Sequence, residues 1–349
     1  METFQFRLRE FPDLLPWRQS PFSAETEQKS NQWVRNHLGG LFPDAAQLEE
    51  FIDCRLALWP CLAYPDASPE RLLAICNWNQ LWFRLDDLAT YDPQLSTSKE
   101  SARKAYVHLK NALCHTTDSD YLPARLATMA WQAFSGLSNS QRTRFVGAYG
   151  DMLDGFMSEV TYRSGASECD FDTCMDIHRV SGGMTWTLVH LEYGLGIDVS
   201  TQMKSHPELE EISRPAIDHT LLTNAILAFR KEYFTGDPMN PVACLIRSRG
   251  WDIQRSVDHV QELILDLEKE FIARRDRILA GELGQDPEVC SYLDAVGRWM
   301  KGTLRWQFIS PRYHGRGWEW NGLTSGWVTI TPQRTVITPS PQIGPVSLP

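Results

Sequence analysis

Long hydrophobic runs are missing from this sequence. No stretch of about eighteen consecutive apolar residues occurs in the 349-residue chain, so no transmembrane helix is expected. The segment 1–17 carries charges throughout and has no apolar centre, which argues against a secretory signal. These absences favour a cytoplasmic protein.

Positive charge is also scarce. The chain has 34 Lys and Arg against 44 Asp and Glu, which gives a formal net charge of −10. Nucleic acids and anionic membranes attract basic surfaces, so neither is an expected partner. A few well-placed cations could still bind a phosphorylated ligand within an acidic protein.

Paired cysteines and glycine-rich nucleotide loops are absent as well. The eight cysteines are irregularly spaced and form no CxxC motif. This is expected of reduced and mostly buried thiols in an intracellular protein. Cys169 and Cys174 flank an acidic stretch, but two cysteines do not define a zinc site.

Helical periodicity dominates what the sequence does contain. Apolar residues recur at the spacing of one helical face, and Ser68, Ser138 and Gly281 supply cap signals. We therefore predict an all-α fold, a single large helical bundle that ends near Tyr313. Its expected helices are 45–58, 69–85 running into Asp86, 98–113, 122–137, 140–163, 169–193, 206–211, 214–234, 240–249, 253–280 and 289–308.

The last segment of the chain differs in composition. Residues 318–349 are rich in proline and poor in charge, and the alternation at 327–337 is interrupted by a proline. We predict a helical domain over 1–317 and a flexible Pro-rich tail over 318–349.

Two adjacent carboxylates stand out. Asp86 and Asp87 follow an apolar segment that contains Trp82 and Phe83. Neighbouring carboxylates near a helix C-terminus are unfavourable unless they are solvated or bound to a cation. Hard divalent cations prefer such oxygen ligands. Taken alone, the pair is more simply interpreted as a solvated helix end.

A second group of oxygen ligands lies further along the chain. Asn224 and Glu232 are eight residues apart, so on one helix they share a face and lie about 12 Å apart along the axis. If they faced the aspartate pair, the two helices could hold magnesium between them. Taken singly, each is equally compatible with a solvated helix face.

Two arginines complete the set of candidates. Arg179 precedes Gly182 and Gly183, which predict a local helix break. Arginine suits bidentate phosphate binding, although a lone arginine is usually a surface charge. Arg312 and Tyr313 follow the last helix and could form either a phosphate clamp or a helix cap.

The order and spacing of these motifs resemble those of the class I terpene synthases of fungi and bacteria, chiefly the sesquiterpene cyclases, over roughly residues 50–315. The family has an Asp-rich motif, a diphosphate-sensing arginine, a second metal motif with a conserved continuation, and a final Arg-Tyr pair. The matching residues are Asp86, Asp87, Arg179, Asn224, Lys231, Glu232, Gly236, Asp237, Asn240, Val242, Arg312 and Tyr313.

This chain departs from the family pattern at several positions. Thr90 stands where a further carboxylate is usual, and Asp92 is out of phase with it. Ala225 and Ala228 replace an aspartate and a hydroxyl residue of the second motif, and Gly182 replaces an often acidic residue. The missing hydroxyl at 228 puts the usual count of three magnesium ions in doubt.

The resemblance implies a carbon–oxygen lyase that ionises farnesyl diphosphate with Mg²⁺, releases diphosphate and cyclises the allylic cation to a sesquiterpene. The protein would be a monomer or homodimer. The implied metal ligands are Asp86, Asp87, Asn224 and Glu232. The implied diphosphate contacts are Arg179, Lys231, Arg312 and Tyr313. The candidate pocket aromatics are Trp82, Phe83, Phe156, Trp186, Trp299, Trp306 and Phe308.

Three alternatives stay open at this point. A diterpene synthase would use geranylgeranyl diphosphate on the same motifs. A chain-elongating prenyltransferase should carry a second Asp-rich motif, which this chain lacks. A non-catalytic helical binding or scaffold protein would explain the helices but not the ordered set of metal- and phosphate-directed residues.

Overall fold

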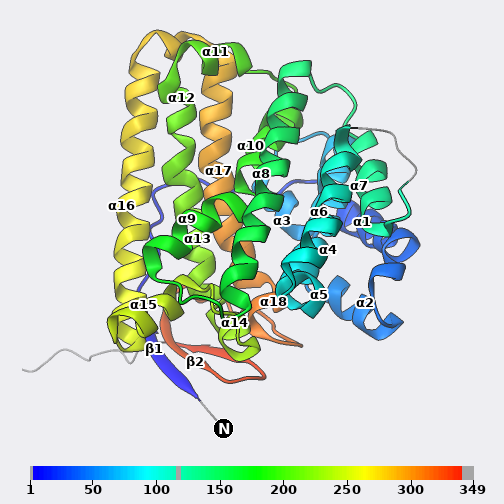
Figure 1. Cartoon of the computed structure of the whole chain (residues 1–349). Coiled ribbons are helices and arrows are strands. Elements are labelled where there is room, and N and C mark those ends of the chain that lie inside the picture. Colours follow the sequence, from blue (N-terminus) through cyan, green and yellow to red (C-terminus); the bar gives the residue numbers. More distant parts are fainter. Residues whose placement is uncertain (1–2, 115–118, 340–349) are drawn as a thin grey trace, which may run out of the picture.

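The chain folds into a helical bundle with a small antiparallel sheet at one end (Figure 1). The computed structural model describes residues 3–114 and 119–339. Helix α13 packs against both α16 and α17 along one side of the bundle, and α4, α6, α7 and α8 form the other side. The elements are β1 (Phe4–Leu8), α1 (Ser23–His37), α2 (Ala45–Asp53), α3 (Leu58–Ala63), α4 (Pro69–Tyr91), α5 (Pro93–Ser96), α6 (Lys99–Cys114), α7 (Leu122–Gln132), α8 (Asn139–Arg163), α9 (Phe171–Ser181), α10 (Met184–Leu195), α11 (Ser200–Ser205), α12 (Pro207–Glu211), α13 (Ser213–Leu227), α14 (Phe229–Thr235), α15 (Pro241–Arg249), α16 (Ile253–Ala280), α17 (Pro287–Ile309), α18 (Pro311–His314), β2 (Gly326–Ile330) and β3 (Thr335–Thr338), with 3-10 turns at Gly39–Leu41 and Glu282–Gln285.

Side-chain caps fix several helix ends where the sequence predicts them. Ser68 accepts a hydrogen bond from the backbone of Arg71 at the start of α4. Ser138 and Gln141 form a reciprocal capping box at the start of α8, and Gly281 ends α16. The predicted all-α class and these caps are confirmed, although α1 escaped prediction because its sequence is mostly polar.

Two segments that were predicted as single helices are broken. The expected break at Gly182 and Gly183 separates α9 from α10, where Gly183 has a φ of +69° and a Cβ would lie 2.7 Å from the indole nitrogen of Trp186. The segment 214–234 also divides, at Ala228, into α13 and α14. Backbone hydrogen bonds from Ala228 to Asn224 and from Glu232 to Ala228 continue through this second break.

The expectation of a flexible tail from residue 318 is wrong for the part that forms β2 and β3. The sheet order is β1-β2-β3, all antiparallel, and Phe4 of the first strand pairs with Ile330. Inward-facing Val328 and Ile337 pack with Phe6 in an apolar cluster. Burial of these side chains holds the hairpin, and the rest of the predicted tail, residues 340–349, lies outside the described residues.

The sheet is tied to the bundle by polar contacts. The Arg230 guanidinium donates to the carbonyl oxygens of Tyr313 and Pro332, both at 2.8 Å, and so joins α14, α18 and the β2–β3 turn. Downstream of β1, the Leu14 backbone donates to Glu268 of α16 at 3.0 Å. The N- and C-terminal strands therefore close the end of the bundle that carries α14 and α18 (Figure 1).

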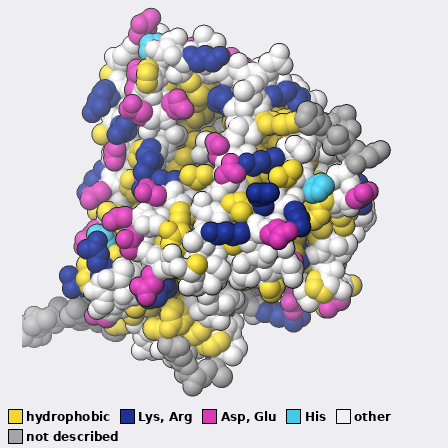
Figure 2. Space-filling model, viewed as in Figure 1, with side chains coloured by type: hydrophobic (Ala, Val, Ile, Leu, Met, Phe, Trp, Pro, Cys, Tyr) yellow, Lys and Arg dark blue, Asp and Glu magenta, His cyan; other side chains and the backbone are white. Residues whose placement is uncertain are grey.

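The outer surface carries both signs of charge. Acidic and basic side chains are interspersed over the face in Figure 2, with small apolar areas between them. Within the described residues, no helix combines the length and the apolar character needed to cross a membrane.

Candidate active site

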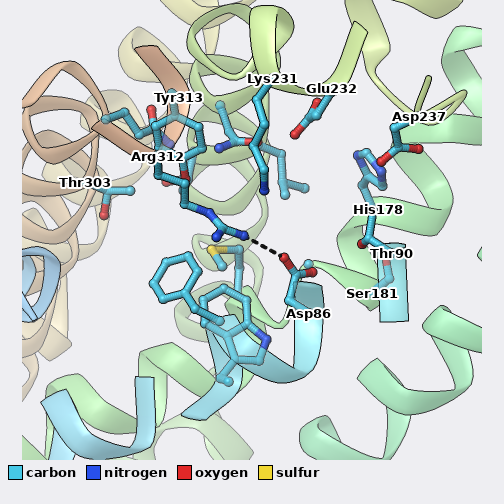
Figure 3. Close-up of a pocket in the computed structure, with 18 of the residues that line it drawn as sticks. Asp86, Thr90, His178, Ser181, Lys231, Glu232, Asp237, Thr303, Arg312 and Tyr313 are labelled. Carbon is cyan, nitrogen blue, oxygen red and sulfur yellow. Dashed lines mark hydrogen bonds and ion pairs between the residues drawn. The ribbon is translucent and has the colours of Figure 1, made fainter. Parts of the chain in front are cut away.

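A cavity of about 130 Å³ lies inside the bundle, bounded by α4, α8, α9, α13, α14, α17 and α18. Figure 3 shows that its polar side chains come from opposite sides and point toward the same space. The wall comprises Trp59, Trp82, Phe83, Asp86, Thr90, Tyr91, Glu159, Arg163, His178, Ser181, Gly182, Met184, Thr220, Leu221, Asn224, Lys231, Glu232, Asp237, Thr303, Trp306, Gln307, Arg312 and Tyr313.

The aspartate pair lies on the last turns of α4, which continues beyond it to Tyr91. Asp86 lines the cavity, whereas Asp87 is held in ion pairs beside it. Arg312 binds the two oxygens of Asp87 at 2.8 and 2.9 Å and reaches Asp86 at 3.3 Å (dashed in Figure 3). Lys231 lies 3.3 Å from Asp87. Two cations therefore face two carboxylates across one side of the cavity.

The two aspartates titrate differently because their partners differ. Burial raises the pKa of Asp86 to about 6, and the Asp87 charge adds to the rise against the opposing effect of Arg312. Burial would also raise the pKa of Asp87, but Arg312 and Lys231 outweigh it and hold that pKa below its usual range. Asp87 is thus bound by Arg312 through both of its oxygens, whereas Asp86 makes one longer contact and can still bind a cation.

The opposite wall carries the second predicted motif. Asn224 of α13 and Glu232 of α14 both line the cavity, despite the helix break between them. Asn240 donates to Glu232 at 2.7 Å and to the backbone of Ala225 at 2.8 Å, so it orients the glutamate. Burial, followed by the charge of Asp237, raises the pKa of Glu232 to about 7.

These donors suit a hard divalent cation. Asp86, Asn224 and Glu232 present carboxylate and amide oxygens to one cavity, and both carboxylates hold their charge at an energetic cost that a cation would relieve. Ala225 and Ala228 are fully buried and contribute no oxygen ligand from their side chains. The donor set therefore fits magnesium whose remaining positions are filled by water and substrate phosphate.

Arg179 does not join this group. Its guanidinium binds both oxygens of Asp218, at 2.7 and 3.0 Å, and Asp176 at 2.5 Å, and it is not part of the cavity wall. The preceding residue, His178, faces the cavity instead, together with Ser181 (Figure 3). One residue along a helix is a rotation of about 100°, so Arg179 and His178 have different surroundings in this structure.

A different arginine, on α8, escaped prediction. Arg163 lines the cavity and is paired with Glu159, one turn earlier, and with Asp237 at 3.3 Å. Burial alone would lower the pKa of Arg163, but the two carboxylates raise it well above its usual range. The i, i+4 spacing of Glu159 and Arg163 was visible in the sequence, yet nothing there showed that this helix face is buried.

The aromatic wall is smaller than predicted. Trp82, Phe83 and Trp306 line the cavity, as do Trp59 and Tyr91, which the sequence did not single out. The remaining predicted rings are buried elsewhere in the core and do not belong to the wall; they are Phe156, Trp186, Trp299 and Phe308.

Comparisons with known proteins identify the family of this chain. The family model described as terpene synthase family 2, C-terminal metal binding, matches residues 77–270, which is more than half of the chain. A (3S,6E)-nerolidol synthase of Selaginella moellendorffii is 27% identical over 350 residues, covering 96% of this chain and 91% of the relative. Sesquiterpene synthase 3 of Postia placenta is 24% identical over 319 residues, covering 89% and 85%.

The fold is also shared with solved structures. Germacradien-4-ol synthase from Streptomyces citricolor superposes with a TM-score of 0.74 at 18% identity, covering 86% of this chain and 98% of that one. The metal-binding description of the family indicates use of a divalent metal. The chain therefore belongs to the class I terpene synthases, lyases that act on prenyl diphosphates.

Proposed function

We propose that this enzyme is a sesquiterpene synthase that uses Mg²⁺ to ionise farnesyl diphosphate and then cyclises the allylic cation. The observation that carries the proposal is the shared cavity of Asp86, Asn224, Glu232, Lys231 and Arg312, which opposes oxygen ligands to phosphate-directed cations. The fifteen-carbon substrate is supported by the relative named sesquiterpene synthase 3.

The metal would be held from two sides. Asp86 would bind from α4, and Asn224 and Glu232 would bind from α13 and α14, while Asp87 supports the site through Arg312. Bound magnesium would stabilise the negative charge that develops on the leaving diphosphate. With no side-chain ligand at Ala228, we expect at most three ions and a thinner protein shell around one of them.

The diphosphate would be gripped by the cations that now bind carboxylates. Lys231 and Arg312 point into the cavity from one side, beside Tyr313, and Arg163 lies on another wall (Figure 3 labels the first three). We assign Arg163, rather than Arg179, to the diphosphate because Arg179 is bound to Asp218 away from the wall. Guanidinium groups bind phosphate oxygens in pairs.

The reaction begins with heterolysis of the bond between substrate C1 and the bridging oxygen. The electron pair leaves on diphosphate, where Lys231 and Arg312 stabilise it, and the carbon chain becomes an allylic cation. The faces of Trp82, Phe83 and Trp306 line the space for that cation, and each could stabilise it by about 0.5–2 kcal/mol. An apolar wall also keeps water from ending the reaction early.

Product analysis tests this proposal. The enzyme should be incubated with Mg²⁺ and, separately, geranyl, farnesyl and geranylgeranyl diphosphates, and the organic extract analysed by gas chromatography–mass spectrometry. We expect hydrocarbons or alcohols of fifteen carbons from farnesyl diphosphate. Turnover of only the twenty-carbon substrate would make the protein a diterpene synthase, and no product from any substrate would overturn the proposal.

A further inference from the structure

Three cysteines that the proposed reaction does not use come together on the flank of the active site. Cys169 lies in the connection before α9, Cys174 near the start of α9, and Cys244 near the start of α15, which packs against α9 (Figure 1). Their sulfur atoms all lie within 4.8 Å of one another, and all three residues are buried. Segments about 70 residues apart in sequence thus bring three soft ligands to one point.

One guanidinium and two helix N-termini lie close to the three sulfurs. The Arg247 guanidinium donates to the Cys244 sulfur at 3.3 Å. Cys174 and Cys244 also lie near helix N-termini, whose dipoles stabilise thiolates. A fixed positive charge therefore lies beside the cluster.

Geometry and charge both match a zinc ion. Tetrahedral coordination with zinc–sulfur bonds of about 2.3 Å separates the sulfurs by roughly 3.8 Å, so the cluster needs to contract by at most about 1 Å. Three thiolates around a divalent cation leave one negative charge, which Arg247 can balance. We propose that Cys169, Cys174 and Cys244 form a zinc site, with water in the fourth position.

The position of the cluster gives such a site a structural role. Cys174 donates to the Met239 carbonyl oxygen at 2.7 Å, and Arg247 donates to the Pro238 carbonyl oxygen. These two carbonyls belong to the loop that ends in Asn240, the residue that orients Glu232. Zinc would replace the Cys174 proton and would end its hydrogen bond to Met239. The ion would instead join α9 to Cys244, four residues after Asn240, and so hold this loop behind Glu232 without contact with substrate.

Two other uses of the cluster predict different behaviour. Reduced thiols that merely pack as small apolar side chains would bind no metal. A disulfide between any two of them would need an oxidant and would remove two ligands. The metal content and the number of free thiols, measured on the same protein, distinguish both alternatives from a zinc site.

The test is zinc stoichiometry in the full-length enzyme. Protein purified with a thiol reductant should be loaded with Zn²⁺ in the presence of excess Mg²⁺, desalted and analysed by inductively coupled plasma mass spectrometry. We expect about one zinc per chain, and protection of three thiols from a thiol-reactive dye. Substitution with Co²⁺ should give the near-ultraviolet absorption of thiolate-to-cobalt charge transfer.

Matched variants decide whether the cysteines hold the ion. Cys244→Ser and Cys174→Ser should lose the zinc, whereas Cys290→Ser, outside the cluster, should keep it. Glu232→Gln should also keep it, because the carboxylate site is separate. Wild-type protein that takes up no zinc, or that forms a disulfide within the cluster, would overturn the inference. Zinc retained by both cluster variants would also overturn the inference. The cobalt spectrum is recorded on the wild-type protein, so the test does not depend on correct folding of the variants.

Discussion

At the residue scale, the two aspartates of α4 have unequal duties. Asp87 is paired with Arg312 and Lys231, while Asp86 lines the cavity and has a pKa that burial raises. A family match treats the pair as one motif. The contacts separate it into a carboxylate that orients cations and a carboxylate that remains available to a metal.

Asp86→Asn should lower kcat by about 100-fold or more, since it removes the charge that binds the metal while keeping the side-chain shape. Steady-state kinetics at several Mg²⁺ concentrations would measure it. Asp92→Asn is the matched control, because Asp92 only caps α5 through Gln94, a bond that asparagine can keep. Full activity in Asp86→Asn would show that the metal is held elsewhere.

Arg163 and Arg179 make a second informative pair. Arg163→Met should weaken binding of pyrophosphate with Mg²⁺ by about 10- to 150-fold, the value of a lost charged hydrogen bond. Arg179→Met should change the affinity for pyrophosphate by less than about threefold, because Arg179 is bound to Asp218. Isothermal titration calorimetry measures both, and Arg163→Lys should recover part of the loss. The opposite ranking would restore Arg179 to the diphosphate site.

A buried histidine supplies a pH-dependent prediction for stability. Burial lowers the pKa of His190 to about 3, and its ring stacks on Phe134 with centroids 5.0 Å apart. Below the unfolded pKa of about 6.5, the unfolded chain binds a proton that the folded chain refuses, so stability falls as the pH falls. Over the window from pH 6.5 to 5 the loss should reach about 2 kcal/mol.

The matched variant isolates this contribution. His190→Leu keeps an apolar side chain of similar size and removes the titrating ring, so the free energy of unfolding should decline less steeply below pH 6.5. Urea unfolding at half-unit intervals from pH 5 to 7.5 gives both curves. Parallel curves for the variant and the wild type would show that His190 has the same pKa in the folded and the unfolded state.

At the scale of elements, local signals were read correctly and long-range pairing was not. Ser68 and Ser138 cap helices as predicted, because a cap depends on residues within one turn. The sheet was missed because β1 pairs with a strand more than 300 residues away, and no local pattern encodes that partner. The position of Arg179 outside the cavity wall has a related cause: spacing along a chain does not fix the face of a helix.

The strand pairing makes its own prediction. Ile330→Ala should lower the free energy of unfolding by about 2–5 kcal/mol, since Ile330 is 2% exposed beneath the sheet. Thr329→Ala, on the more exposed face, should change it by about 0.5–1 kcal/mol. Urea unfolding measures both. Equal, negligible effects would mean that residues 326–338 do form the flexible tail that composition suggests.

At the scale of the whole molecule, most of the charged side chains of the cavity are paired with one another. Arg312 and Lys231 face Asp86 and Asp87, while Arg163 lies between Glu159 and Asp237. Magnesium alone could reach Asp86 and Glu232 only beside Arg312 and Lys231, whose positive charges repel it. Pyrophosphate alone would meet those carboxylates directly. Only together can magnesium take the carboxylates while the diphosphate takes the released arginines and lysine.

Thermal unfolding should therefore respond to the combination and not to its parts. Magnesium plus pyrophosphate at about 100 times the dissociation constant should stabilise the fold by about 2.7 kcal/mol, whereas either alone should shift the melting temperature little. Differential scanning fluorimetry measures this without any turnover. In Arg312→Met the stabilisation by magnesium plus pyrophosphate should be smaller, because the variant lacks the arginine that binds Asp87 now and would bind the diphosphate. Equal stabilisation by magnesium alone would show that the aspartates are free to bind metal before the diphosphate arrives.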